Sequence, residues 1–432
     1  MPILYSVRIL LTLLLLANLV GADECPVPNQ VPIYSVELEG IHHTRPGVIY
    51  QALEHRVGKT FSCALWVIEK NRLKDLDIFA SITLQGEVKR DAQGDSVKLK
   101  YQFTELPPYI PLASINKTDQ DGLSLGPALI SLNFLGTGKR LEAMARFFGT
   151  TEYQVSLSGR QLWEHAIEFD MAWIHVDSYN PNDHYHEDSH RLKADGIFPL
   201  AWGLGLAGFG ELFTVKSDTI LLRPGRDWVP RLGIGLRWDG RDRALQPRKG
   251  VFMETRMTQN GGFLGGPADY WEELIDIRAY TPLFSRFSLM ANTLYQYRNL
   301  GKVGSMGAYE NFHVGGANTL RGYETNVMAG RNEHLINAEF RWDLVLEKTQ
   351  KLGPWSLQYA LQLVSGLDGA SLWNSDKIWD NAFAFGPYVG MHILIPGLDR
   401  LRFEVGMHGF RGDVLWHFGL FEKTTVQRFR TR

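Results

Sequence analysis

The sequence predicts a mainly β protein: a transmembrane antiparallel β-barrel, built from 16 strands, that follows one small α/β domain. Three observations favour this fold class. Aromatic residues and glycine are both abundant, with 12 Trp, 16 Tyr, 23 Phe and 43 Gly, which is typical of many short strands joined by turns. Apolar and polar residues alternate through most of the chain. After the first segment, no stretch approaches the roughly 18 apolar residues of a membrane-spanning helix.

Length and composition exclude several other classes. A chain of 432 residues is too long for one ordinary core, so a large and a small domain are expected. The 45 Lys+Arg against 47 Asp+Glu give a net charge of −2, which argues against a nucleic-acid partner. Two cysteines exclude a disulfide scaffold and a four-cysteine zinc site.

Residues 1–22 have the pattern of a secretory signal peptide. Arg8 precedes an apolar run from Ile9 to Leu16, and the segment closes on the small residues of 20–22. The run is too short to span a membrane, which favours a cleaved signal. In an oxidising compartment Cys25 and Cys63 would be able to pair, and two free thiols are the alternative.

Residues 31–107 predict the small α/β domain. A strand alternates over Tyr34–Leu38, and Pro46 opens a helix that stops at Gly58. A second helix carries apolar residues at helical spacing, namely Leu65, Ile68, Leu73 and Leu76. Two strands follow, over 78–88 and 97–103. This order, together with an acidic-proline exit at Glu105–Pro107, resembles a polypeptide-transport-associated (POTRA) domain; another periplasmic α/β module is the alternative.

Residues 108–432 alternate with a period of two, which predicts the barrel. In Arg231–Asp239, Asn337–Leu344 and Leu401–His408, apolar residues occupy one face and charged residues or glycine most of the other. In a closed barrel the apolar face meets lipid and the polar face lines a wet lumen. Sixteen strands leave about 20 residues per strand with its connection, where about 9–11 must span. Twelve or fourteen strands also fit this length.

Four motifs follow one another along the barrel. They are a Gly-rich turn at 133–141, an Asp-x-Arg-Asp segment at 239–242 with a Pro-x-x-Gly turn at 247–250, a Gly-Gly…Leu-Arg-Gly-Tyr segment at 315–323, and two strand segments carrying Glu339 and Asp368. In this order they resemble the BamA/TamA superfamily of outer-membrane assembly barrels (the bacterial surface antigen family). The resemblance covers essentially the whole mature chain.

The resemblance implies a site made of one loop tip. Leu320, Arg321, Gly322 and Tyr323 would form the tip of a long loop folded back into the barrel lumen, and Arg321 would pair with Glu339 or Asp368 on the facing wall. A guanidinium in a lumen needs such a carboxylate partner. The alternative is that Arg321 is a solvated loop residue. We expect structural and gating roles, not catalysis.

The resemblance also implies a function. The chain would assemble or translocate polypeptides at the bacterial outer membrane, with the POTRA domain in the periplasm. Its partners would be the outer-membrane lipid bilayer and unfolded outer-membrane or secreted polypeptides; periplasmic chaperones or lipoproteins are further candidates. The alternatives are a dedicated two-partner-secretion-like transporter and a passive outer-membrane pore.

Motifs of catalysis are missing from the sequence, so we expect no enzyme activity and no cofactor. The segment 183–190 is rich in His, Asp and Glu. It follows Asn180-Pro181-Asn182, so we expect a solvated surface loop there and no metal site.

Overall fold

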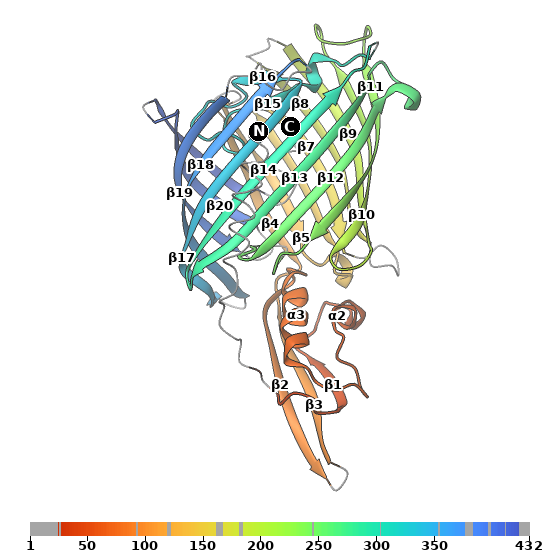
Figure 1. The fold of residues 1–432 in the computed structure, drawn as a ribbon, viewed down its shortest axis with the longest axis vertical. Helices are drawn as coiled ribbons and strands as arrows, with labels where there is room; N and C mark the ends of the chain where they lie inside the picture. The colour runs from red at the N-terminus through yellow and green to blue at the C-terminus, as the bar shows by residue number, and fades with distance from the viewer. Residues whose placement is uncertain are drawn as a thin grey trace.

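The computed structural model describes residues 25, 27–91, 94–118, 122–160, 167–180, 185–243, 246–302, 304–352, 355–375, 383–395, 399–410 and 412–422. These residues form a small α/β unit with a three-stranded sheet, a 16-stranded sheet curled into a barrel, and a two-stranded sheet (Figure 1). The predicted signal segment, residues 1–22, lies outside the described residues. Among the described residues, none of the helices is long and apolar enough to cross a bilayer.

The N-terminal unit has the element order expected from the sequence: β1 (Ile33–Glu39), α2 (Pro46–Ala52), α3 (Cys63–Lys74), β2 (Phe79–Asp91) and β3 (Gly94–Glu105). β3 is the central strand, parallel to β1 and antiparallel to β2. α2 ends well before the predicted stop at Gly58. A disulfide joins Cys25 to Cys63, the first residue of α3, and ties the start of the described chain to this unit.

The buried face of α3 differs from the predicted one. Ile68 is 48% exposed, and the buried residues are Trp66, Glu69 and Leu73. Glu69 replaces the expected apolar residue because its carboxylate is fully bonded inside. It accepts hydrogen bonds from the backbone N–H of His55 at 2.7 Å and from the His55 ring at 2.6 Å. A buried carboxylate with such partners does not pay the cost of an unpaired charge.

The barrel has 16 antiparallel strands, in agreement with the predicted number, and neighbouring strands in the sheet are consecutive along the barrel. The first eight are β4 (Tyr109–Thr118), β5 (Gly122–Ser131), β6 (Arg140–Phe148), β7 (Thr151–Gly159), β8 (Glu168–Asn180), β9 (Tyr185–Pro199), β10 (Leu204–Lys216) and β11 (Asp227–Asp239). The other eight are β12 (Gly250–Gly261), β13 (Asp269–Phe284), β14 (Phe287–Asn299), β17 (Asn332–Leu352), β18 (Trp355–Trp373), β19 (Phe383–Ile395), β20 (Asp399–Met407) and β21 (Val414–Glu422).

The barrel is nearly closed. β4 and β21 are the two end strands of the sheet and lie in contact with each other. Among the described residues, no ladder of paired residues joins them. The first and last strands therefore form a seam that differs from every other strand boundary in the barrel.

The barrel wall is apolar outside and polar inside, as the alternation predicts. On β11, Leu232 is 56% exposed and Ile234 is 62% exposed. On β12, by contrast, Glu254 is only 2% exposed and Arg256 only 6% exposed. Apolar side chains that face outward and charged side chains that face inward are the reverse of a soluble protein and match a barrel embedded in lipid.

The Gly-rich turn between β5 and β6, which contains η1 (Phe134–Gly136), holds the N-terminal unit. The amide of Asn133 donates to Oγ1 of Thr44 at 2.8 Å, and the carbonyl O of Asn133 lies 2.9 Å from the His43 ring. Gly136 has φ +73°, and a Cβ there would lie 2.3 Å from the carbonyl O of His43. Only glycine fits this close approach.

The histidine-rich segment is the second departure from the sequence-based expectation. Tyr185–His190 lies on strand β9 and not in a loop, while residues 183 and 184 lie outside the described part of the chain. The polar run extends the hairpin because each of its described residues is paired with a residue of β8 in the ladder, which local composition does not indicate.

Candidate functional site

The connection between β14 and β17 folds back into the barrel. It contains η3 (Ala308–Glu310), β15 (Phe312–Val314) and β16 (Met328–Gly330). Its tip, Leu320–Tyr323, lies against the wall: Leu320 is fully buried and packs with Leu274, Leu294 and Leu335 of β13, β14 and β17. Gly316 has φ +86°, and its N–H donates to the carbonyl O of Tyr323, which closes the loop on itself.

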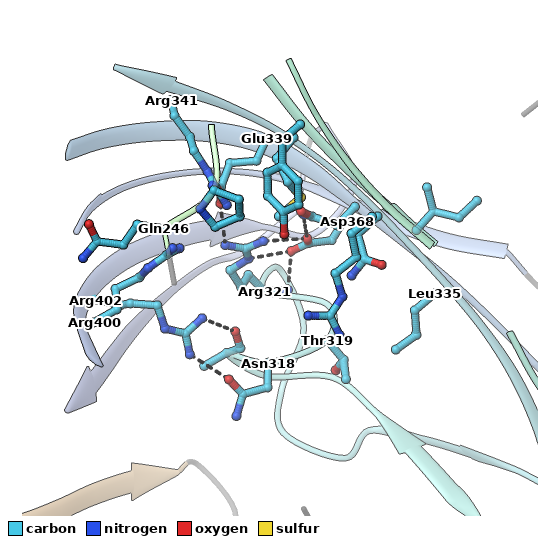
Figure 2. Close-up of a pocket in the computed structure, with 18 of the residues that line it drawn as sticks. Gln246, Asn318, Thr319, Arg321, Leu335, Glu339, Arg341, Asp368, Arg400 and Arg402 are labelled. Atoms are coloured by element: carbon cyan, nitrogen blue, oxygen red, sulfur yellow. Dashed lines mark hydrogen bonds and ion pairs between the residues drawn. The ribbon is translucent and has the colours of Figure 1, made fainter. Parts of the chain in front are cut away.

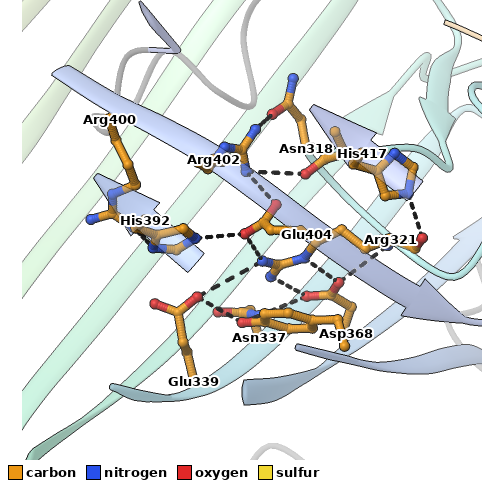
Figure 3. A network of polar contacts seen from close by, with 12 residues as sticks. Asn318, Arg321, Asn337, Glu339, Asp368, His392, Arg400, Arg402, Glu404 and His417 are labelled. Atoms are coloured by element: carbon orange, nitrogen blue, oxygen red, sulfur yellow. Dashed lines mark hydrogen bonds and ion pairs between the residues drawn. The ribbon is translucent and has the colours of Figure 1, made fainter. Parts of the chain in front are cut away.

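Arg321 is the centre of the contacts between the tip and the wall. Its Nε and Nη2 each donate to one oxygen of Asp368, both at 2.8 Å, and its backbone N–H donates to the same carboxylate at 3.2 Å (Figure 3). The planar guanidinium and the carboxylate thus form a bidentate pair, the strongest geometry available to these groups. The Arg321 guanidinium carbon also lies 3.2 Å from the centre of the Tyr388 ring.

A second carboxylate completes the binding of Arg321. Nη1 donates to Oε1 of Glu404 at 2.7 Å. Glu339 lies farther away, with 3.8 Å between Nη1 and its Oε2, and is held instead by Arg341 and Tyr388 at 2.6 and 2.8 Å. The guanidinium, with side-chain exposure of 8%, therefore connects the loop to β18 and β20 directly, and to β17 only at longer range.

The backbone of the tip lies unusually close to β20. A Cβ on Gly322 would lie 2.0 Å from the carbonyl O of Met407, and a Cβ on Gly406 would lie 2.2 Å from the carbonyl O of Arg321. Tyr323 adds a further hold, because its hydroxyl donates to the carbonyl O of Phe385 at 3.2 Å. The ring of His417 on β21 donates to the carbonyl O of Arg321. The tip is thereby linked to the last strand of the barrel.

Beside the tip is a pocket that is open to solvent (Figure 2). Its lining includes six arginines, at positions 241, 278, 321, 341, 400 and 402, but only two carboxylates, Glu339 and Asp368. Arg402 donates to the side chain of Asn318 at 2.7 Å and to the carbonyl O of Ala317 at 3.2 Å, which fixes the loop just before its tip. The lining thus presents an excess of guanidinium groups to the lumen.

The structure brings Arg321 and Asp368 into direct contact and leaves Glu339 as a neighbour of the pair. Glu404 is a carboxylate partner of Arg321 that the sequence reasoning missed. The signal was present, because Glu404 occupies the charged face of the alternating segment Leu401–His408. Which of many inward-facing carboxylates meets the loop depends on strand positions around the barrel, and these are not encoded in local sequence.

A barrel with an apolar outer face, a charged lumen and a loop ion-paired inside that lumen defines a class, the transmembrane β-barrels with a loop folded into the lumen. The Omp85 superfamily domain matches residues 133–408. The chain therefore belongs to the Omp85 superfamily.

Individual relatives agree with this assignment. Over 333 residues the chain is 21% identical to the outer membrane protein assembly factor BamA of Nitratidesulfovibrio vulgaris; the match covers 73% of this chain and 42% of the relative. The chain thus spans less than half of that curated relative.

Two solved structures share the fold. One is BamA from Haemophilus ducreyi lacking POTRA domains 1–3, with TM-score 0.55, 13% identity, and coverage of 90% of this chain and 83% of the other. The second is CdiB from Escherichia coli, with TM-score 0.57, 15% identity, and coverage of 90% and 74%.

Proposed function

We propose that this chain assembles or translocates polypeptides at the bacterial outer membrane. In this proposal residues 1–22 are a signal peptide, residues 31–107 form a periplasmic POTRA domain, and residues 108–432 form the barrel. The observation that carries the proposal is the loop tip held inside the lumen, against the wall, by the contacts of Arg321 with Asp368 and Glu404. A lumen that contains this loop would slow the free diffusion of solutes, so the barrel wall would be the surface that acts on client polypeptides. The likeness to an assembly factor supports the same reading.

Client capture would take place at the N-terminal sheet. β1 and β2 are its edge strands, and an edge strand can pair with an extended polypeptide through main-chain hydrogen bonds that are independent of sequence. The start of β1 is already covered, since Ile33 exchanges backbone hydrogen bonds with Gly58 and Lys59. We therefore assign capture to β2, which extends over 13 residues.

Insertion or export would then use the barrel seam. Among the described residues no ladder joins the end strands β4 and β21, and a strand leaving water must satisfy its backbone groups before it enters lipid. Pairing with a seam strand would lower that cost. His417 on β21 bonds to the loop tip, so movement of the loop and opening of the seam would be coupled.

Site-specific photocrosslinking tests the capture step. A photoreactive phenylalanine analogue placed at Thr83 or Gln85, both exposed on β2, should crosslink to a urea-unfolded barrel protein added to the intact chain. The matched control is Ile68, which is exposed on α3. Equal crosslinking at all three positions, or crosslinking at Ile68 alone, would contradict capture at β2.

Bilayer recordings separate transport from a passive pore. The proposal predicts that the purified chain shows low, intermittent conductance, and that Arg321→Ala raises it by freeing the loop. Arg223→Ala, at an exposed residue of the β10–β11 connection, should leave conductance unchanged. A large, steady conductance in the unmodified chain, insensitive to Arg321→Ala, would favour the pore. A dedicated transporter for one secreted substrate would share the low conductance and differ only in the number of its clients.

A further inference from the structure

A second cluster of charged and polar side chains lies on the outer face of the barrel, on the hairpin β8–β9. His175 is directly opposite His190 in the ladder. Asp188 lies two residues before His190, so both side chains project from the same face of β9. Trp173 lies two residues before His175, and its partner Leu192 lies two residues after His190. These neighbours are 40% and 60% exposed, which identifies this face as the outer one.

The cluster lies near the end of the barrel away from the N-terminal unit. β4 begins directly after that unit, and each following strand reverses direction, so β8 ends and β9 begins at the opposite rim (Figure 1). Aromatic rings flank the cluster: Tyr153 stacks on His175 at 5.6 Å and Trp173 stacks on His190 at 6.2 Å. Aromatic side chains are typical of the level where a barrel leaves the hydrocarbon layer, so the cluster is within reach of water.

The three side chains converge on one point. Nδ1 of His175 lies 3.6 Å from Oδ1 of Asp188, and Nε2 of His190 lies 3.8 Å from the same oxygen. All three atoms lie within 4.8 Å of one another. A tetrahedral metal ion with ligands at about 2.0–2.1 Å needs ligand atoms roughly 3.4 Å apart. The two separations to Oδ1 are within a few tenths of an ångström of this value, and the two ring nitrogens lie within 4.8 Å of each other.

An independent observation concerns Oδ1 of Asp188. This atom is buried, and within the described part of the chain it accepts no hydrogen bond. A buried carboxylate oxygen without a hydrogen-bond donor is costly, and a cation at the convergence point would satisfy it. Arg226 approaches the other oxygen, Oδ2, at 3.8 Å, whereas Oδ1 faces the ring nitrogens of His175 and His190.

The His175 ring has one competing contact. Its Nδ1 lies 3.1 Å from the carbonyl O of Ser189, to which it can donate a proton. A metal ion binds the neutral ring through a lone pair and would take the place of that proton.

We propose that His175, Asp188 and His190 bind one transition-metal ion of the Zn²⁺ class on the outer rim of the barrel. Two imidazole nitrogens and one carboxylate oxygen suit Zn²⁺ with a fourth position for water. Mg²⁺ and Ca²⁺ prefer oxygen ligands alone and fit poorly. The ion would join the two strands of the hairpin across their outer face.

Calorimetric titration of Zn²⁺ into the untagged full-length chain, folded in detergent and stripped with a chelator, tests the site. The expected result is one Zn²⁺ per chain. His175→Ala and His190→Ala should each weaken binding by more than about 100-fold, since even outer partners of metal ligands contribute about 10- to 100-fold. Asp188→Asn, which keeps the side-chain shape, should weaken binding as well. Co²⁺ bound to the unmodified chain should give the visible absorption of a tetrahedral site.

The matched control is His186→Ala. His186 lies on the same face of β9 and pairs with Asp177 at 2.8 Å, apart from the three ligands, so its removal should leave Zn²⁺ binding unchanged. Heat-modifiability on gels confirms that each variant folds. Absence of Zn²⁺ binding, equal binding in the ligand variants, loss of binding in His186→Ala, or equally strong binding of Mg²⁺ would each overturn the proposal.

Discussion

At the scale of single residues, Arg321 links the loop to the wall because one guanidinium can serve two carboxylates at once. Asp368 receives the bidentate pair and Glu404 the remaining nitrogen, while the Tyr388 ring lies over the flat face. Lysine has a single compact charge and offers no such planar fork. Because Arg321 lies closer to Asp368 than to Glu339, the two carboxylates should stabilise the loop to different extents, and this difference is testable.

Asp368→Asn should free the loop tip far more than Glu339→Gln. Each charge-assisted hydrogen bond contributes about 1.5–3 kcal/mol, so losing the bidentate partner should raise the population of displaced loop by about 10- to 100-fold. The reporter is a cysteine at the fully buried position of Leu320, whose modification rate by a water-soluble thiol reagent follows that population. Equal modification rates in the two variants would show that these distances do not determine how strongly each carboxylate holds the loop tip.

The sequence predicts this site only in part. The motif at 315–323 identifies the tip, and alternation places Glu339 on the inner face. Glu404 is 83 residues from Arg321 in the chain, and it becomes a neighbour only because β17 to β20 are consecutive in the wall. Local patterns indicate which way a side chain points, but not which loop it meets.

At the scale of elements, the loop needs glycine where it touches β20. Gly322→Ala would place a methyl group 2.0 Å from the Met407 carbonyl O, and the wall backbone cannot retreat without breaking its ladder. We expect the cysteine at position 320 to react at least about tenfold faster in this background, a shift of about 1.4 kcal/mol. Gly208→Ala is the control, because no atom lies within 4 Å of a Cβ there. A normal rate in Gly322→Ala would mean that the tip tolerates the methyl group.

The junction between the N-terminal unit and the barrel should depend on pH through Glu105. Its carboxylate accepts the backbone N–H groups of His42, His43 and Thr44, and the last two contact Asn133 in the barrel turn. Burial works to raise the pKa of the Glu105 carboxyl, but these hydrogen bonds outweigh it and hold the pKa below its ordinary value. Stabilisation is therefore complete above the ordinary pKa of about 4.5 and is lost as pH falls through the lowered one.

Spin labels on the N-terminal unit and the barrel measure this effect. The two native cysteines are joined in a disulfide, so cysteines introduced at the exposed positions Ile68 and Ser285 can be labelled selectively. The distance distribution should be narrow at pH 7 and broaden in acid. Glu105→Gln should be broad at both pH values. A distribution in the unmodified chain that does not change with pH would contradict the role of Glu105.

Element types were largely predictable, and the exceptions have physical causes. On α3, helical spacing suggested Ile68 as a buried residue, whereas the hydrogen bonds of Glu69 with His55 turn a different face inward. On β9, polar composition suggested a loop, but pairing with β8 extends the strand through it. In both cases, partners on a neighbouring element override the local preference.

At the scale of the whole molecule, lipid acts as the solvent of the barrel. Period-two alternation over residues 108–432 predicted the barrel because only a closed sheet satisfies its backbone in a bilayer. The length of this region favoured sixteen strands but also fitted twelve or fourteen. The sequence alone did not reveal how the two parts join, since the turn at Asn133 and the loop at His43 are 90 residues apart. The seam between β4 and β21 likewise becomes visible only in the folded chain.

The central claim is that this barrel assembles or translocates other polypeptides. Quantitative proteomics of the outer membrane after depletion of the protein tests that claim most directly, with re-expression of the unmodified chain or Arg321→Ala as controls. We predict a fall in many barrel proteins, or in one secreted or surface protein if the chain is a dedicated transporter, restored by the unmodified chain and only weakly by the variant. An unchanged outer-membrane and secreted proteome would contradict the claim and leave a passive pore.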